Sequence, residues 1–147
     1  MCHYMITSTI GNLHEYTFVP VPPSKCQTDA AYDDRMTAIL RIAQTLKPVM
    51  DYRELVLQNA STVASHASTA NRPTPEEIMA NYRLDENLQA GCRDNIVIFD
   101  DVLTAGSHFK AMKRFLQQSF PEASVLGLFV ARTTRDADVT SLFDVLD

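Results

Sequence analysis

Two runs of consecutive apolar residues in the second half of the chain indicate buried strands. They are NIVIF, from Asn95 to Phe99, and SVLGLFVA, from Ser124 to Ala131. Strands of a parallel sheet are covered on both faces, so they read as continuous apolar runs. Between them, residues from Ser107 to Phe120 follow a helical period that Pro121 ends. The apolar face of this predicted helix carries Phe109, Met112, Leu116 and Phe120.

The first half of the chain gives the same order of elements. YTFVPVP, from Tyr16 to Pro22, predicts a short strand ended by prolines, which cannot donate to a strand ladder. Apolar residues at helical spacing predict a helix from about Asp29 to Leu46, with Pro48 after it. RELVLQ, from Arg53 to Gln58, predicts a second strand. Two strand, helix, strand units predict an α/β fold, with a doubly wound, mainly parallel sheet and helices on both faces.

The segment NASTVASHASTANRPT, from Asn59 to Thr74, has a different character. It is rich in Ser, Thr, Ala and Asn and has almost no large apolar residue, so it predicts a flexible loop over residues 59–74. Loops of this length in compact domains are often functional lids, although its composition fits a connector without a role equally well. TPEE, from Thr74 to Glu77, has the capping-box pattern with Pro at the first helical position, which predicts a short helix after the loop.

Length and composition place the chain in a broad class. Its 147 residues fit a single domain spanning residues 1–147, and an apolar content of 46% is ordinary for a soluble globular protein. No apolar run approaches the roughly 20 residues that span a bilayer, and the N-terminal residues lack the features of a signal peptide. The cysteines, Cys2, Cys26 and Cys92, are far apart and have no zinc-ligand spacing. We therefore expect a cytoplasmic protein with reduced thiols and no membrane partner.

The net charge of −5 at pH 7 disfavours a protein that coats nucleic acid through charge alone. A small basic group, Lys110, Lys113 and Arg114, lies on the polar face of the predicted helix 107–120. The net charge therefore does not exclude a local contact between this basic group and nucleic acid.

Two adjacent carboxylates, Asp100 and Asp101, follow the strand NIVIF directly. In parallel α/β sheets, ligands bind at the carboxyl ends of the strands. The turn that follows, VLTAGS, enters a helix N-terminus, where free N–H groups and Gly106 favour a phosphate and where Thr104 and Ser107 add hydroxyl donors. The carboxylates suit sugar hydroxyls, or Mg²⁺ held through its water ligands. The pattern therefore predicts a site for a ligand with both hydroxyls and a phosphate.

Other classes of protein also place acids after a buried strand. A Walker B strand is disfavoured because the chain contains no GxxxxGK[ST] segment. Aspartate-nucleophile phosphatases use DxD, and receiver domains carry their acid pair and phosphoacceptor on separate strands. A purely structural alternative is a buried strand whose acids cap the next helix. This alternative does not explain the rest of the DDVLTAGS segment.

The segment IVIFDDVLTAGSH, from Ile96 to His108, resembles the phosphoribosyl-diphosphate (PRPP) signature of type I phosphoribosyltransferases. It is most similar to the orotate phosphoribosyltransferase and ComF-type variants, which carry Thr where the hypoxanthine-guanine type has a further Asp. VPVPPSK, from Val19 to Lys25, resembles the ComF-type strand and its pyrophosphate loop, while YDDRM, from Tyr32 to Met36, departs from the ComF-type pattern. Residues from Ser68 to Leu84 resemble the flexible catalytic loop of the family.

The resemblance implies Mg²⁺-dependent transfer of phosphoribosyl from PRPP to a nitrogen acceptor, a nucleobase or related compound, with release of pyrophosphate. Asp100 and Asp101 would hold the ribose hydroxyls and, through water, Mg²⁺. Arg72 would close over the diphosphate. The residues implied to bind PRPP are Ser24, Lys25, Asp100, Asp101, Thr104, Ala105, Gly106, Ser107 and His108.

The resemblance leaves the acceptor open. The segment after Ala131 is short and acidic, so the hood that binds the acceptor in this family is expected to be minimal or absent. The alternative function is a catalytically weak regulator that binds PRPP or a nucleotide, or a ComF-like protein associated with DNA metabolism. The resemblance also implies a homodimer.

Overall fold

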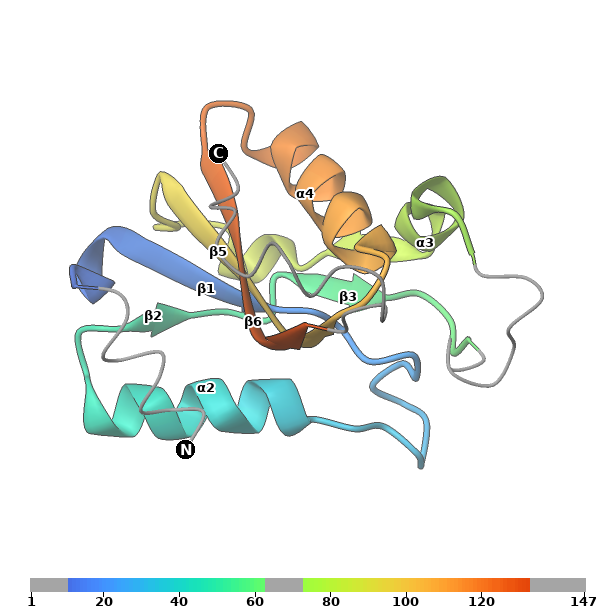
Figure 1. Cartoon of the computed structure of the whole chain (residues 1–147), viewed down its shortest axis with the longest axis horizontal. Helices are drawn as coiled ribbons and strands as arrows, with labels where there is room; N and C mark the ends of the chain where they lie inside the picture. The colour runs from blue at the N-terminus through green and yellow to red at the C-terminus, as the bar shows by residue number, and fades with distance from the viewer. Residues whose placement is uncertain (1–10, 63–72, 133–147) are drawn as a thin grey trace, which may run out of the picture.

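The computed structural model describes residues 11–62 and 73–132 of the chain (Figure 1). The elements, in chain order, are the 3-10 helix η1 (Leu13–Glu15), β1 (Tyr16–Pro20), α2 (Arg35–Leu46), β2 (Asp51–Tyr52), β3 (Val56–Gln58), α3 (Pro75–Ala80), β4 (Tyr82–Leu84), the 3-10 helix η2 (Glu86–Leu88), β5 (Asn95–Leu103), α4 (Ser107–Ser119) and β6 (Ser124–Arg132). Within these described ranges, no helix combines the length and the apolar character needed to cross a bilayer.

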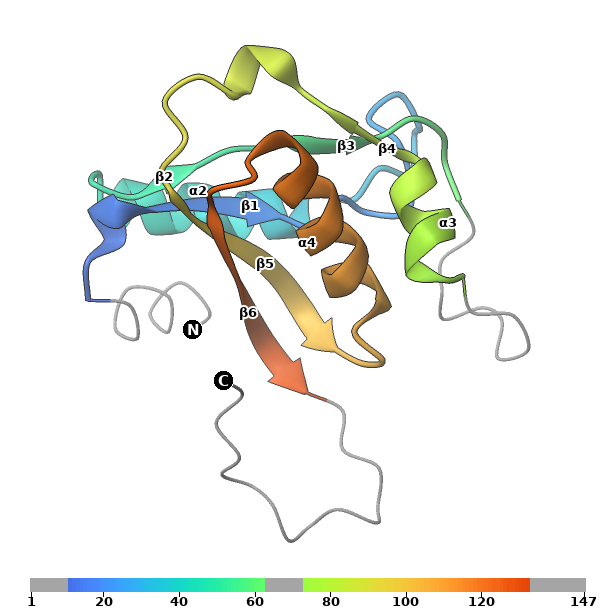
Figure 2. The same cartoon turned by 90° about the horizontal axis from the view of Figure 1, so that it is seen from above.

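A four-stranded parallel sheet in the order β2-β1-β5-β6 forms the centre of the fold. β1 and β5 lie beside each other at its middle, with Tyr16 opposite Asn95 and Pro20 opposite Phe99. The chain therefore leaves both central strands at the same edge of the sheet (Figure 2). This register places the segment after Pro20 next to the end of β5.

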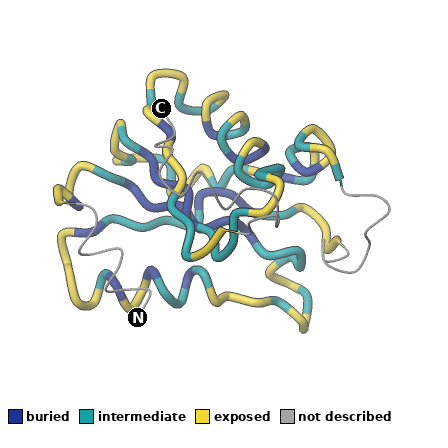
Figure 3. Tube along the Cα trace, viewed as in Figure 1, coloured by how far each residue is buried: buried dark blue, intermediate teal, exposed yellow. Residues whose placement is uncertain are grey.

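Helices cover both faces of the sheet, and the alternation of side chains along β5 divides the core between them. Ile96 and Ile98 pack with Met112 and Leu116 of α4 and with residues of β3 and β4. Val97 and Phe99 face the other way and pack with residues of α2. Figure 3 shows the buried segments concentrated in the strands between these layers. The predicted α/β class and the buried parallel strand β5 are confirmed. The strand predicted over residues 124–131 is present as β6, but its predicted burial is wrong: β6 is the edge strand of the sheet, and Val125 is its one buried residue.

The same alternation continues to the end of β5, which is longer than predicted. The strand runs to Leu103 and so contains both Asp100 and Asp101. Because side chains alternate between the two faces, Asp100 falls on the face covered by α4 and Asp101 on the face covered by α2. The two carboxylates therefore lie on opposite faces of the sheet at the end of β5.

The predicted strand over residues 53–58 is wrong in its first half. The chain leaves the parallel sheet after Tyr52, and Val56–Gln58 pairs instead with Tyr82–Leu84 in a separate antiparallel sheet. Leu55 and Val56 of this segment are buried in one cluster with residues of β4, α3 and the main sheet. A strand was predicted correctly for Val56–Gln58, while its antiparallel partner β4 was not expected.

The ends of the other elements differ from the predictions for local reasons. α2 begins at Arg35 rather than near Asp29, because the carboxylates of Asp29 and Asp33 accept hydrogen bonds from the N–H groups of Ala31 (2.9 Å) and Arg35 (3.1 Å). Such side-chain bonds to the backbone two residues on favour turns over helix. β1 ends at Pro20 instead of Pro22.

Two helix predictions in the second half are confirmed. The capping box at Thr74 is present, with the N–H of Glu77 donating to Thr74 Oγ1 (3.3 Å) and the N–H of Thr74 donating to Glu77 Oε2 (2.7 Å). The helix expected over residues 107–120 is α4, which ends at Ser119.

Candidate functional site

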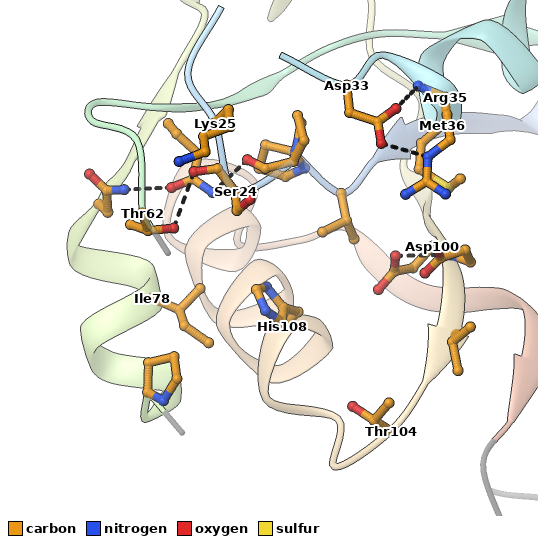
Figure 4. Close-up of a pocket in the computed structure, with 18 of the residues that line it drawn as sticks. Ser24, Lys25, Asp33, Arg35, Met36, Thr62, Ile78, Asp100, Thr104 and His108 are labelled. Carbon is orange, nitrogen blue, oxygen red and sulfur yellow. Dashed lines mark hydrogen bonds and ion pairs between the residues drawn. The ribbon is translucent and has the colours of Figure 1, made fainter. Parts of the chain in front are cut away.

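A cavity of about 670 Å³ lies at the carboxyl ends of β1 and β5 (Figure 4). Its wall combines the loop after β1, the start of α2, the end of β3, the helix α3, the end of β5 and the start of α4. Ionisable side chains are numerous in this wall: they are Lys25, Asp33, Arg35, Glu77, Asp100, Asp101 and His108. An opening of this kind, with convergent charged groups, is the expected form of a binding site for a small polar ligand.

The structure brings most of the predicted site residues together. The residues from the predicted set that line the cavity are Ser24, Lys25, Asp100, Asp101, Thr104 and His108. Ala105, Gly106 and Ser107 form the adjoining turn and the start of α4 but do not line the cavity. Arg72 lies outside the described residues, as does most of the loop predicted over residues 59–74. Two segments far apart in sequence, Ser24–Lys25 and Asp100–His108, therefore share one cavity.

Asp100 has an unusual environment at the end of β5. Burial raises the pKa of its carboxyl to about 6, and the neighbouring Asp101 carboxylate adds to the rise. A hydrogen bond from the backbone N–H of Asp101 to Asp100 Oδ1 (2.9 Å) acts in the opposite direction, because it stabilises the anion. Asp100 is therefore ionised above about pH 6. Its ionisation destabilises the folded protein, because the buried carboxylate has lost contact with water.

The turn from Thr104 to Ser107 fits an anion. Gly106 adopts a left-handed conformation with φ of 74° and caps α4 without a side chain. A residue with a Cβ would be strained at this φ, so glycine is required by the turn. The first-turn N–H groups of an α-helix have no intrahelical acceptor, and Thr104, which lies shortly before α4 in the chain, lines the cavity.

The loop after β1 is held from the opposite side of the cavity. The carbonyl of Ser24 accepts hydrogen bonds from the backbone N–H (2.7 Å) and the hydroxyl (3.2 Å) of Thr62, and Gln58 Nε2 donates to the carbonyl of Pro23 (2.7 Å). These bonds fix the backbone of the loop and leave the ammonium of Lys25 at the cavity wall. Thr62 itself also lines the cavity.

Sequence reasoning missed several residues of the wall. Asp33 and Arg35 form an ion pair at the start of α2, with Arg35 Nε 2.6 Å from Asp33 Oδ2. In Figure 4 the guanidinium of Arg35 extends toward the side of the cavity where Asp100 lies. Glu77 and Asn81 come from α3 and the position after it. No spacing in the sequence links these residues to Asp100, because each comes from a different element.

The donor set around Asp100 and Asp101 fits Mg²⁺ better than a transition metal. The two carboxylates supply hard oxygen ligands, whereas the described ranges contain no group of three or more His, Cys, Asp or Glu side chains that could enclose an ion. Mg²⁺ usually keeps several water ligands and is shared between one or two carboxylates and the phosphates of a substrate. These residues could hold Mg²⁺ only together with such a ligand.

Cys26, next to Lys25, carries an activated thiol. Hydrogen bonds with the hydroxyls of Ser61 and Thr28 lower the pKa of its thiol to about 7 (Sγ to Oγ 3.4 Å and Sγ to Oγ1 3.3 Å). Burial instead raises the pKa of Cys92. Because the thiolate is the nucleophile, we expect iodoacetamide at pH 7 to label Cys26 at least about tenfold faster than Cys92.

The labelling is measured by peptide mass spectrometry on a Cys2→Ser variant, which removes the third thiol. The same reaction in denaturant is the control, since both thiols then have similar environments and their rates converge. Equal rates in the folded protein would contradict the expectation.

A scan of the sequence against models of known protein families finds no match, and a search of curated proteins finds none either. The function is therefore inferred from the cavity and from the motif around Asp100. The arrangement can bind a phosphate at the start of α4, accept hydrogen bonds from hydroxyls at the end of β5, and place a cation, Lys25, across the cavity.

Proposed function

We propose that this protein binds PRPP with Mg²⁺ and transfers the phosphoribosyl group to a nitrogen acceptor, a nucleobase or related compound, with release of pyrophosphate. The observation that carries the proposal is the shared cavity of Ser24–Lys25 and Asp100–His108. These are the two segments that resemble the diphosphate loop and the PRPP signature of type I phosphoribosyltransferases. The two segments meet because they follow the neighbouring parallel strands β1 and β5.

The parts of PRPP can be assigned to the cavity and to the turn from Thr104 to Ser107 that adjoins it. The 5′-phosphate lies on the turn from Thr104 to Ser107, where helix N–H groups and hydroxyls donate to it. Asp100 and Asp101 accept from the ribose 2′ and 3′ hydroxyls. Lys25 and the backbone of Ser24 hold the diphosphate, with Arg72 closing over it.

The reaction needs positioning and electrostatic stabilisation more than acid or base chemistry. Cleavage of the bond from C1′ to the diphosphate leaves positive charge on the ribose, which the ionised carboxylates of Asp100 and Asp101 stabilise. When bound, Mg²⁺ supplies charge neutralisation to the leaving diphosphate. The predicted loop over residues 59–74 excludes water, which would otherwise compete with the acceptor.

The finer features of the fold belong to the same proposal. The two units β1-α2-β2 and β5-α4-β6 support a doubly wound core of the type I phosphoribosyltransferase kind, with a minimal hood or none. We propose a cytoplasmic homodimer on the same analogy.

The proposal is tested by calorimetric titration of the wild-type protein with PRPP in the presence of Mg²⁺. We expect saturable binding, and binding at least about tenfold weaker in an Asp100→Asn/Asp101→Asn variant, since each lost charge-assisted hydrogen bond contributes roughly 1.5–3 kcal/mol. The matched control is Asp94→Asn/Glu122→Gln, which removes two exposed acids before β5 and β6, at the amino ends of these strands.

Ribose 5-phosphate and pyrophosphate, titrated separately, distinguish the two halves of the site. No binding of PRPP by the folded wild-type protein would contradict the proposal. Binding without pyrophosphate release, across a panel of nucleobases, would instead favour the regulator over the enzyme.

A further inference from the structure

The hydroxyl of Tyr82 is buried without a hydrogen-bond partner in the described part of the chain. Tyr82 opens β4 opposite Gln58 of β3 and is only 5% exposed. A buried hydroxyl without a partner has lost its hydrogen bonds to water and gained none in return, which destabilises the fold. The hydroxyl therefore calls for an explanation that the packing of the ring does not give.

Apolar contacts explain why the ring of Tyr82 is buried. It packs edge to face on Phe115 of α4, with ring centroids 5.7 Å apart and an interplanar angle of 75°. It belongs to the same buried cluster as Val21, Ile78 and Ile98. Phenylalanine at position 82 would keep each of these contacts and would avoid burying the hydroxyl, so the fold alone favours phenylalanine.

The same neighbours place Tyr82 directly behind the wall of the cavity. Val21 and Ile78 line the cavity as well as packing in its cluster, and Asn81, the residue before it, also lines the cavity. Ile98 and Asp100 lie on one face of β5, the face toward α4 and β4. The negative charge of Asp100 reaches the phenol, since it adds to the effect of burial in raising the pKa of Tyr82.

We propose that Tyr82 is a positioning residue for Asp100, whose carboxylate accepts a hydrogen bond from the phenol when PRPP is bound. A carboxylate has about four acceptor positions, and the backbone N–H of Asp101 uses one of them in this structure. The phenol would fix the remaining oxygen while Asp100 holds the ribose. This inference rests on the proposed function, because it gives Asp100 the role of a ribose ligand.

Other charged groups face the cavity and are unchanged by a substitution at position 82. They come from the loop after β1, from α2, α3, β5 and α4, and are Lys25, Asp33, Arg35, Glu77, Asp101 and His108. The experiment therefore changes the phenol alone and reads its hydrogen bond directly.

The test uses the full chain and a Tyr82→Phe variant. We expect the melting temperature of the ligand-free variant to equal or exceed that of the wild type, and its dissociation constant for PRPP with Mg²⁺ to rise three- to tenfold. In wild-type protein with tyrosine labelled by ¹³C at Cζ, we expect the Tyr82 resonance to shift when PRPP is added. That shift should be absent from an Asp100→Asn variant at saturating PRPP, and Tyr82→Phe should weaken binding no further in that background.

Tyr16→Phe is the matched control, since Tyr16 starts β1 at the opposite end of the strands from the cavity. It should leave the dissociation constant unchanged. Unaltered binding by Tyr82→Phe, or a Tyr82 resonance that PRPP does not move, overturns the inference while leaving the proposed function in place. Failure of the wild type to bind PRPP removes both.

Discussion

Replacing Asp100 by asparagine is expected to stabilise the folded protein by about 2–3 kcal/mol at pH 8 and to leave its stability unchanged near pH 3. Burial raises the pKa of Asp100 to about 6 in the folded chain, against an ordinary value of 3.8. Between these two values the folded state binds more protons than the unfolded state, so the stability of the wild type falls as pH rises from about 4 to above 6. One pKa unit corresponds to about 1.4 kcal/mol, which gives the expected size.

Asparagine removes this pH dependence because it stays neutral while its oxygen can still accept from the N–H of Asp101. Urea unfolding at several pH values between 3 and 8 measures the effect. The exposed acid Asp94, just before β5, gives the control variant Asp94→Asn, whose stability should follow that of the wild type at every pH. A gain that is the same at pH 3 and pH 8 would contradict the account, and so would a loss of stability at pH 8.

The stabilisation and the proposed loss of PRPP binding in Asp100 variants have the same physical origin. A carboxylate enclosed by apolar residues is costly to ionise, and the same enclosure strengthens its interaction with a ligand hydroxyl or a cation. Stability alone would favour asparagine at position 100. Together with the buried hydroxyl of Tyr82, this gives two neighbouring groups that the fold alone disfavours.

The sequence predicted the neighbouring parallel strands β5 and β6, the helix α4 and the residues around Asp100 because their signals are local. NIVIF and SVLGLFVA are continuous apolar runs, and the turn to α4 follows the acids directly. A site built from one strand end and the next helix can be read from neighbouring residues.

Other features depend on contacts between distant segments and left little trace in the sequence. β3 and β4 have three residues each, and what makes them strands is their mutual pairing. Asp33, Arg35 and Glu77 reach the cavity only because α2 and α3 start beside it. Arg53 is a further case: it lies in the segment predicted as a strand, yet its side chain connects β2 to the carbonyls of Leu88, Ala90 and Gly91.

Arg53→Ala is expected to destabilise the protein by about 2–3 kcal/mol, because it removes a partly buried ion pair and the hydrogen bonds of a charged group. The Nε atom of Arg53 lies 3.1 Å from Asp51 Oδ2, and each of the two side chains is only 20% exposed. Its terminal nitrogens donate to three backbone carbonyls at the end of η2 and just after it, those of Leu88 (2.8 Å), Ala90 (2.5 Å) and Gly91 (3.0 Å). The substitution would leave the carboxylate and these carbonyls without their donor.

The hydrogen bonds extend beyond Arg53 into the sheet. We therefore do not expect rearrangement of neighbouring side chains to compensate for the loss of Arg53. Asp51 Oδ2 also accepts from the hydroxyl of Thr17 (2.7 Å), a fully buried residue of β1, and Thr17 Oγ1 accepts from the N–H of Arg93 (2.9 Å), just before β5. β1, β2, the turn after η2 and the approach to β5 are thus connected through one pair of charges. Lysine at position 53 keeps the charge but has no fork of donors, so Arg53→Lys should recover only part of the lost stability.

Chemical unfolding of the wild type, Arg53→Ala and Arg53→Lys measures these differences, with Arg83→Ala as the control. Arg83 is an exposed residue of β4, and its loss should change the free energy of unfolding by no more than about 0.5 kcal/mol. None of the network residues lines the cavity, so the dissociation constant for PRPP should be unchanged in Arg53→Lys under conditions where it is folded. Equal stabilities of Arg53→Ala and Arg83→Ala would mean that water replaces the guanidinium at no cost, and the network would then have no structural role.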